Sequence, residues 1–320
     1  MKIGLVLFSG VGSMDGANPT SRDIVNFAKL AEQVGLDSVW LTDHFYFDFA
    51  DFAAIGIPLP PELDGTKSGA WECWSLVSAI AAVTQTINVG TLIASTSFRN
   101  PALLARMAET VDDISNGRLI LGLGAGDFAF EHRSAGYPFD RQISRFEEAI
   151  EIISKLLKGQ EVSVDGEFYN VREAKILPKG PRPQGPPLLV GSVFGRPRMT
   201  RLTLQYADFW NCFIAFGENN IEQYRDAWKD LQVACDKYAR DPATVRRSVS
   251  LSISFTDSPF PIPGTQPISG SIAEIADTIA EFAEEGIEHC MIMLHPYTST
   301  GIEQLGRVVE SVANRGSSEL

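Results

Sequence analysis

Short apolar runs alternate along the chain with longer segments in which apolar residues recur at helical spacing. Most of the runs are apolar throughout, as strands covered on both faces must be. An alternation of such strands with helices is typical of repeated βα units around a parallel sheet. The runs predict eight strands, at residues 3–8, 38–42, 87–95, 119–124, 187–192, 208–212, 248–255 and 289–294.

The segments between the runs carry helix start and stop signals. Asn100 and Pro101 stand at the cap and first-turn positions of one predicted helix, which is expected to close at Gly117. Ser271 and Glu274 have the spacing of a capping box at the start of another. These boundaries support the helical interpretation of the segments.

Eight βα units without an internal sequence repeat predict a (β/α)₈ TIM barrel, with a doubly wound open sheet as the alternative. No linker divides the chain, so we expect residues 1–320 to form one domain. Irregular insertions interrupt the pattern at about 43–70, 125–139, 158–186 and 256–270. We expect these insertions at the C-terminal face of the strands.

Composition supports a globular protein with an ordinary core. The chain has 320 residues, of which 44% are hydrophobic, enough to bury a core without disulfides or metals. Its four cysteines contain no CxxC pair, which argues against a zinc or thioredoxin-like site. We expect reduced, buried side chains at Cys73, Cys212, Cys235 and Cys290.

Charge and the first residues limit the partners. The net charge of −13 repels nucleic acid and anionic membranes unless a local basic patch overrides it. The first apolar run has six residues before Ser9, too few for a signal peptide or a membrane span. We therefore expect a cytoplasmic enzyme that acts on a small molecule, without nucleic-acid or membrane partners.

Polar residues that follow a predicted strand are the first candidates for chemistry, because reacting groups of a parallel barrel lie at the carboxyl ends of its strands. Asp43 and His44 follow the second strand. A histidine can act as an acid or a base near neutral pH, and an adjacent acid can control its charge. The alternative is that one residue of the pair caps the following loop and the other is merely exposed.

The residues after His44 are aromatic. They either form an apolar wall over a planar ligand or pack a loop with its own side chains. The sequence does not separate these two alternatives. The aromatic residues are Phe45, Tyr46, Phe47, Phe49 and Phe52.

Gly124, Gly126 and Ala129 fit the GxGxxA form of the dinucleotide fingerprint after a strand. A Rossmann site requires a helix to start there. Gly136 and Pro138 are expected to prevent a helix over the next ten residues. We therefore interpret the glycines as positions where the backbone approaches a flat ligand closely.

Three arginines follow the fifth strand in "GSVFGRPRMTRL". With a glycine-rich turn and a helix start, Arg196, Arg198 and Arg201 are typical of a phosphate-binding site. Alternatively, they cover the outside of the barrel and pair with surface acids. The chain contains no HxH or HxxxH motif and only four histidines, so we expect no metal site.

Several blocks of sequence resemble the luciferase-like monooxygenase superfamily. They are "VWLTDHF", "TINVGTLIASTSFRNPALLARMAETVDDISNGRLILGLGAGD", "EHRSAGYPF", "PPLLVGS" and "YADFWN". Within that superfamily, the chain is most similar to oxidoreductases that use the deazaflavin coenzyme F420, such as the F420-dependent glucose-6-phosphate and secondary alcohol dehydrogenases. The resemblance implies a TIM barrel that transfers a hydride between F420 and a small organic substrate.

The resemblance also implies residue roles. His44 matches a histidine beside the reactive carbon of the deazaflavin, and Leu92 and Ile93 match a pair joined by a non-proline cis peptide. Asp127 matches a glutamate involved in proton handling, so the expected catalytic residues are His44 and Asp127, with Glu131 as a second group. The expected cofactor-binding residues are Asp43, His44, Thr91, Leu92, Ile93, Ala125, Gly126, Asp127, Gly191, Ser192, Val193 and Gly195.

The expected substrate pocket consists of Phe45, Asp48, Phe130 and His295. Asp48 and Phe130 replace a tryptophan and an asparagine of the sugar-phosphate enzyme, which argues against a phosphorylated sugar. The alternative functions are an FMN-dependent monooxygenase with a partner reductase, a non-catalytic flavin-binding protein and a metal-dependent hydrolase. The family also implies a homodimer.

Overall fold

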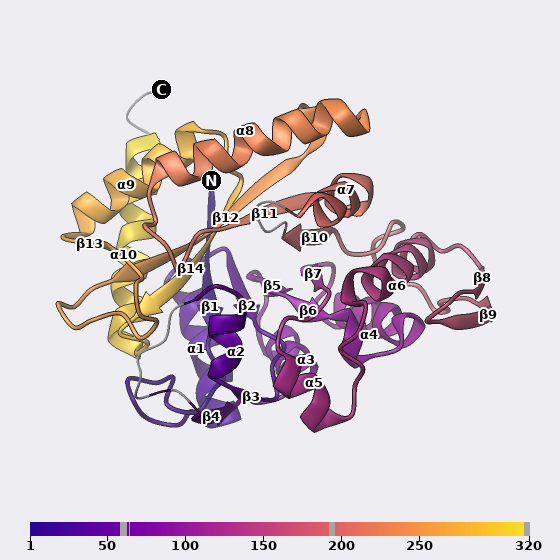
Figure 1. The fold of residues 1–320 in the computed structure, drawn as a ribbon. Helices are drawn as coiled ribbons and strands as arrows, with labels where there is room; N and C mark the ends of the chain where they lie inside the picture. Colours follow the sequence, from indigo (N-terminus) through magenta and orange to yellow (C-terminus); the bar gives the residue numbers. More distant parts are fainter. Residues whose placement is uncertain (58–62, 64, 192–195, 317–320) are drawn as a thin grey trace.

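Eight parallel strands close into a barrel in the computed structural model, which describes residues 1–57, 63, 65–191 and 196–316 (Figure 1). Neighbouring strands pair in the order β10, β11, β12, β14, β1, β2, β5 and β7, and β7 pairs with β10 to complete the ring. The predicted TIM barrel is therefore confirmed, and the open sheet is excluded. The strands are β1 (Lys2–Leu7), β2 (Ser38–Leu41), β5 (Asn88–Thr91), β7 (Leu119–Gly124), β10 (Leu188–Gly191), β11 (Phe209–Phe213), β12 (Arg246–Ser254) and β14 (His289–His295).

Helices surround the barrel (Figure 1). The predicted caps are confirmed: Asn100 accepts a hydrogen bond from the backbone at the start of α4 (Pro101–Ile114), and Ser271 and Glu274 form a capping box at the start of α9 (Ile272–Glu284). None of the described helices is long and apolar enough to cross a membrane. The long helices are α1 (Ser21–Gln33), α3 (Cys73–Val83), α4 (Pro101–Ile114), α6 (Gln142–Leu157), α7 (Pro197–Tyr206), α8 (Ile221–Tyr238), α9 (Ile272–Glu284) and α10 (Ser299–Gly316).

The core has two layers, because successive residues of a strand point to opposite faces. In β14, Cys290, Ile292 and Leu294 pack in the layer between strands and helices, whereas Met291 and Met293 point into the barrel. All four cysteines are free and buried, as expected. We call the inner layer the lumen cluster: Val6, Trp40, Leu92, Ile120, Leu189, Phe209, Ala215, Met291 and Met293.

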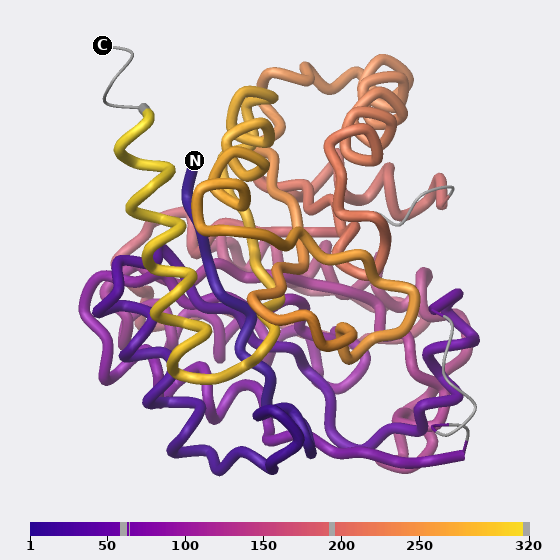
Figure 2. The backbone as a smooth tube through the Cα atoms, turned by 90° about the vertical axis from the view of Figure 1, so that its left-hand side faces the viewer, coloured from indigo at the N-terminus to yellow at the C-terminus, as the bar shows by residue number. Residues whose placement is uncertain are grey.

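Two insertions extend the carboxyl ends of strands. The segment after β2 contains β3 (Tyr46–Asp48), the short helix α2 (Ala50–Ala54) and β4 (Lys67–Gly69), with β3 and β4 antiparallel. The segment after β12 loops out before β13 (Ile268–Ser269), which pairs again with β12 (Figure 2). Both insertions lie where the sequence analysis expects them.

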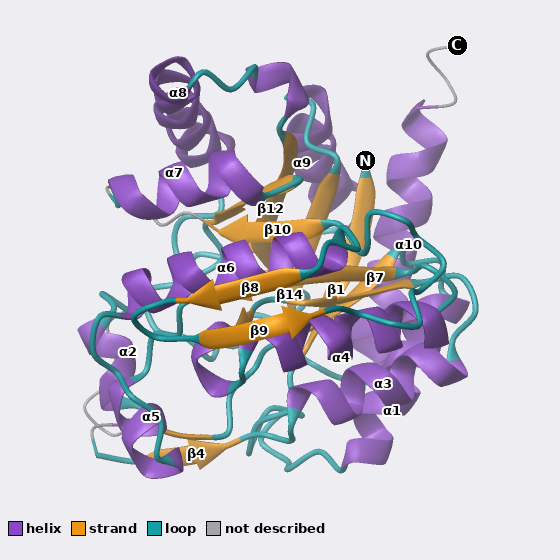
Figure 3. Ribbon diagram, turned by 90° about the vertical axis from the view of Figure 1, so that its right-hand side faces the viewer, coloured by secondary structure: helices purple, strands orange, loops and turns teal. Residues whose placement is uncertain are grey.

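The segment after β7 corrects one prediction. A helix, α5 (Ala129–Ala135), begins four residues beyond Ala125, where glycine and proline were expected to prevent one. Gly136 does not break it prematurely but ends it, in the left-handed conformation (φ 80°) that a C-terminal cap requires. Figures 1 and 3 show α5 beside α2 and the β3–β4 pair, at one end of the molecule.

The insertion at 158–186 also differs from its prediction. It follows α6 and precedes β10, so it lies at the amino ends of the strands and not at their carboxyl face. The physical reason is that each helix returns the chain to the amino end of the barrel. The insertion forms an antiparallel pair, β8 (Val162–Asp165) and β9 (Asn170–Ala174), visible in Figure 3.

Candidate functional site

The predicted strand 87–95 is interrupted at its carboxyl end. A cis peptide joins Leu92 and Ile93, as the resemblance implied, and separates β5 from the short β6 (Ala94–Ser95). The bulge is held against the end of β2 on both sides. Leu92 N–H donates to the carbonyl of Leu41 (2.7 Å), and Ser95 N–H donates to Asp43 Oδ2 (3.0 Å). The bulge therefore lies beside the residues that follow β2.

Glycines in β7 make room for this bulge. A side chain at Gly122 would overlap the carbonyl of Thr91, and one at Gly124 would overlap the side chain of Ile93. Gly122 and Gly124 thus allow close approach of the chain to itself, and the approach of a ligand at Gly124 and Gly126 stays a prediction. The hydroxyl of Thr91, expected to contact a cofactor, donates to the carbonyl of Gly122 at 2.7 Å.

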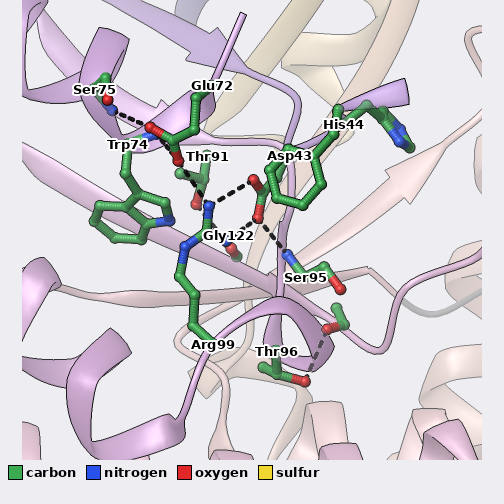
Figure 4. A network of polar contacts seen from close by, with 12 residues as sticks. Asp43, His44, Glu72, Trp74, Ser75, Thr91, Ser95, Thr96, Arg99 and Gly122 are labelled. Carbon is green, nitrogen blue, oxygen red and sulfur yellow. Dashed lines mark hydrogen bonds and ion pairs between the residues drawn. The ribbon is translucent and has the colours of Figure 1, made fainter. Parts of the chain in front are cut away.

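Asp43 belongs to a buried ionic network (Figure 4). Its two oxygens accept hydrogen bonds from Arg99 Nη1 and Nη2 at 2.6 and 3.0 Å, and Arg99 Nη2 also donates to Glu72 Oε1 at 2.8 Å. Glu72 in turn caps the start of α3. Burial raises the pKa of Asp43, and the adjacent Arg99 opposes that rise. The network connects the end of β2 to β6 and α3.

His44 points away from this network (Figure 4). Its Nδ1 lies 3.0 Å from Oε2 of Glu131, a carboxylate that is only 1% exposed. Its ring stacks on Phe128, with centroids 4.7 Å apart and planes inclined by 22°. Glu131 therefore holds one edge of the His44 ring, and Phe128 covers one of its faces. The other ring nitrogen, Nε2, forms no hydrogen bond with the described residues.

The surroundings of His44 favour its protonated form. Burial alone would lower its pKa, but the bond from Glu131 and the negative charges of Asp127, Glu131 and Asp43 raise the pKa to about 9. At neutral pH the ring is consequently an imidazolium, with a proton on both nitrogens. It can act as a proton donor without first collecting a proton from solvent.

Both carboxylate oxygens of Glu131 have partners. Its Oε1 accepts a short hydrogen bond from Phe45 N–H, while Oε2 engages His44. Both contacts join α5 to the segment that follows β2, and Asp51 of α2 adds a third by accepting from Phe130 N–H at 3.1 Å. These contacts hold the His44 ring in place, and the expected catalytic role of Glu131 stays a prediction.

The aromatic residues after His44 pack mainly on one another. Phe52 lies 4.9 Å from Phe128 and 5.8 Å from Phe49, and Phe47 lies 5.5 Å from Phe128. This geometry favours the self-packed loop over a bare wall. The sequence analysis missed Phe128 as the ring that stacks on His44, and its position directly after Asp127 was the available signal.

The other expected pocket residues have structural contacts of their own. Phe45 packs on Phe98 at 4.6 Å, Phe130 lies 5.5 Å from Tyr46, and Asp48 Oδ1 accepts a hydrogen bond from Ala50 N–H at 3.0 Å. Their roles toward a substrate stay predictions.

The remaining expected cofactor residues divide into two groups. Asp127 is exposed, and its charge acts on His44. The carbonyl of Ala125 accepts a hydrogen bond from the Ser97 hydroxyl at 2.7 Å. Gly126, the next residue, adopts a left-handed backbone conformation. Gly191 ends β10. Outside the described residues lie Ser192, Val193 and Gly195.

The predicted phosphate-binding role is wrong for two of the three arginines. Arg198 and Arg201 both pair with Glu147 of α6, which places them on the outer surface. Only Arg196, at the start of α7, has no acidic partner among the described residues. In the described part of the chain, no group of three or more His, Cys, Asp or Glu side chains could hold a metal ion.

Comparison with known proteins places these features in a family. Residues 1–259 match the model of the luciferase-like monooxygenase family. An F420-dependent glucose-6-phosphate dehydrogenase of Amycolatopsis mediterranei is 31% identical over 245 residues, which cover 73% of this chain and 65% of that protein. A 5,10-methylenetetrahydromethanopterin reductase of Archaeoglobus fulgidus is 30% identical over 182 residues, 57% of this chain and 46% of the reductase. The chain thus matches less than two thirds of the length of these relatives.

Solved structures confirm the fold at low sequence identity. An F420-dependent secondary alcohol dehydrogenase in complex with an F420–acetone adduct has a TM-score of 0.71 at 18% identity, over 97% of this chain and 98% of its own. A monooxygenase from Streptomyces bottropensis has a TM-score of 0.77 at 16% identity, over 99% of this chain and all of its own. The fold is thus shared by F420-dependent dehydrogenases and monooxygenases alike.

Proposed function

Because this chain belongs to the luciferase-like monooxygenase family, we propose that it is an oxidoreductase that transfers a hydride between coenzyme F420 and a small organic substrate. The F420-dependent relatives support the choice of cofactor. The barrel itself supports F420 and FMN equally, because a riboflavin lyase solved with a modified FMN also has this fold. The site residues must therefore carry the proposal.

The observation that carries it is the position of His44. His44 follows the carboxyl end of β2, the same strand end to which Leu92 of the Leu92–Ile93 bulge is hydrogen-bonded, and Glu131 holds the Nδ1 of His44. Nε2 is the nitrogen left for a reacting group. A positioned histidine with an oriented second nitrogen is the usual arrangement for general acid or base catalysis.

The residues present fit a flat, partly apolar cofactor. Leu92 packs in the lumen cluster and Ile93 packs against it, so the bulge presents apolar side chains at the barrel mouth. Ser95 Oγ is buried without a hydrogen-bond partner nearby, a polar atom that a ligand could satisfy. We propose that Leu92, Ile93 and Ser95 hold the ring system, and that the chain after Gly191 holds the polar tail.

When bound, F420 would supply a carbon that gives or accepts the hydride. The protein supplies the proton: His44 carries it on Nε2 at neutral pH and gives it to the substrate oxygen or nitrogen during reduction. In the opposite direction His44 must first be neutral, and its raised pKa disfavours that state.

A binding titration tests the cofactor. We expect F420 fluorescence to be quenched on addition of the protein, with tight binding of F420 and weak binding of FMN. His44→Ala should keep the affinity for F420 within a few-fold, yet lower substrate reduction by about 100-fold or more. Tight binding of FMN alone would instead identify a flavin-dependent monooxygenase, and unchanged turnover in His44→Ala would remove the catalytic role of His44.

We also propose that the chain acts as one domain and associates as a homodimer in the cytoplasm, as the family suggests. Sedimentation equilibrium of the purified protein tests the dimer. A mass of about one chain, 35.0 kDa, at micromolar concentration would exclude it.

A further inference from the structure

His295 is placed by strand geometry inside the barrel. It ends β14, where Met291 and Met293 point into the lumen cluster and the residues between them point toward the helices. Side chains alternate along a strand, so His295 shares the inward face of Met291 and Met293. It lies one residue beyond Leu294 at the carboxyl end, the end that also carries His44.

The His295 ring is buried with an unsatisfied polar atom. The residue is only 9% exposed, and its Nε2 has no hydrogen-bond partner. A buried polar nitrogen without a partner costs stability. Since β14 is adjacent to β1, and β1 to β2, this nitrogen lies two strands away from the strand that precedes His44.

The surroundings of His295 are apolar and nearly free of charge. Phe260, from the loop after β12, meets the His295 ring edge to face at 5.8 Å. Phe8, Ile93 and Phe216 join Phe260 in packing on the lumen cluster. Burial lowers the pKa of His295, and Asp15 is the one charged group among the described residues that acts on it. The ring is therefore neutral at pH 7, and within the described part of the chain no cation acts on it that could compensate an anionic ligand.

We propose that His295 is a substrate-binding residue, and that its Nε2 hydrogen-bonds the single polar group of a neutral, otherwise apolar substrate such as a ketone or an alcohol. This inference rests on the proposed hydride transfer and names its substrate class. A neutral imidazole can donate to a carbonyl or accept from a hydroxyl. The surrounding phenylalanines fit the hydrocarbon part of the substrate, whereas a phosphate would be buried without a counter-ion.

Nitrogen NMR of the full-length protein tests the proposal without any cofactor. The four histidines are labelled with ¹⁵N, and the His295 signal is identified by its absence in His295→Gln. We expect the Nε2 signal of His295 to shift on titration with cyclohexanone or cyclohexanol and to stay unmoved with glucose 6-phosphate. His289, at the other end of β14, is the internal control and should not respond. A silent His295, or one that responds to glucose 6-phosphate, would overturn the inference.

Steady-state kinetics with F420 then separate binding from structure. His295→Phe keeps a ring but no polar atom, and we expect it to raise the KM for cyclohexanone about fivefold, the equivalent of one lost hydrogen bond. His295→Gln retains a neutral donor and acceptor and should stay closer to wild type. The Kd of F420 should not change in either variant. If F420 fails to bind at all, the proposed function fails while the NMR result still stands.

Discussion

The charge of the His44 ring depends on its neighbours more than on its own burial. Three acids, Asp43, Asp127 and Glu131, act on it together, and only Glu131 touches it. Asp43 is itself paired with Arg99, from which it accepts two hydrogen bonds. The contact from Glu131 is thus the interaction through which a single substitution should alter His44 most.

We expect Glu131→Gln to lower the pKa of His44 from about 9 toward its ordinary value of 6.5, because burial would then act with less opposition. The pKa is measured from the chemical shift of the His44 ring proton as a function of pH. Asp51→Asn is the matched control, since Asp51 also binds α5, through Phe130 N–H, without touching His44. An equal fall in that control would trace the effect to displacement of α5.

The consequence for catalysis has a definite sign. A protonated His44 is present below its folded pKa, so proton donation should decline as pH rises through about 9 in the wild type. In Glu131→Gln the decline should move to lower pH. The rate of substrate reduction at saturating cofactor, measured from pH 6 to pH 10, reports both limits.

Arg99 is a second residue whose removal should have a large effect. It is paired with Asp43 and Glu72 in a largely buried site, so Arg99→Met leaves the buried Asp43 carboxylate without its counter-ion. Breaking such a pair costs about 3–5 kcal/mol of unfolding free energy, measured by urea denaturation. Arg198→Met removes an exposed pair with Glu147 and should cost less than about 1 kcal/mol. Equal losses would show that burial does not matter here.

At the scale of elements, the turn between β7 and α5 determines where Glu131 lies. Gly126 adopts a left-handed conformation (φ 84°), and a side chain there would meet the His132 ring at 2.6 Å and Ser95 Oγ at 2.9 Å. Gly136, at the other end of α5, is also left-handed (φ 80°) but has open space around it. A side chain at either glycine would thus be strained by the left-handed backbone, and one at Gly126 would also overlap neighbouring atoms.

We expect Gly136→Ala to cost about 1 kcal/mol of unfolding free energy, from the left-handed backbone alone. Gly126→Ala should cost more, by roughly 1–3 kcal/mol for the added overlap, and should also shift α5 and weaken the Glu131–His44 bond. Urea denaturation gives both free energies, and the pKa of His44 reports the shift. Identical losses in the two variants would show that His132 moves aside freely.

The elements that the sequence predicted best are those with a local signal. Continuous apolar runs identified all eight barrel strands, and Asn100 and Ser271 identified helix starts. Helix α5 was missed because Gly136, which ends it, was taken as a residue that prevents it. The Leu92–Ile93 bulge was expected only from resemblance, since nothing local distinguishes it within an apolar run.

Contacts between distant segments account for the rest of the site. The pairing of Glu131 with His44 spans 87 residues, and that of Arg99 with Asp43 spans 56. No spacing rule connects such residues until the barrel brings their strands together. For the same reason, sequence alone could not separate surface arginines such as Arg198 from ligand-binding ones.

At the scale of the whole molecule, the two ends of the barrel differ in their chemistry. The amino end contains a hollow of about 590 Å³ that is lined by His289, Lys2 and Arg246 among others. His289 Nε2 lies 2.6 Å from Ser38 Oγ, which also accepts from Trp40 Nε1 at 2.7 Å. Burial, with a contribution from Lys2 and Arg246, lowers the pKa of His289 to about 3.

His289 should make the fold sensitive to acid. Its pKa is about 3 when folded and about 6.5 when unfolded, so below pH 6.5 the unfolded chain binds a proton that the folded chain does not. Stability should fall by up to about 1.4 kcal/mol per pH unit as pH decreases from 6.5 toward 3. Urea denaturation at several pH values measures the slope of the unfolding free energy against pH. We expect His289→Gln to lower that slope by the contribution of one proton. An unchanged slope in that variant would contradict this account.

The insertion at 158–186 supports the barrel at its amino end. Lys179 forms an ion pair with Glu109, and Arg182 forms one with Asp112; both acids belong to α4. These pairs lie at the amino end of the barrel, near the β7–β10 pairing that closes the ring. The ion pairs therefore stabilise the β7–β10 pairing at the end of the barrel opposite His44. We therefore expect that loops at the carboxyl end can be exchanged without weakening the β7–β10 pairing.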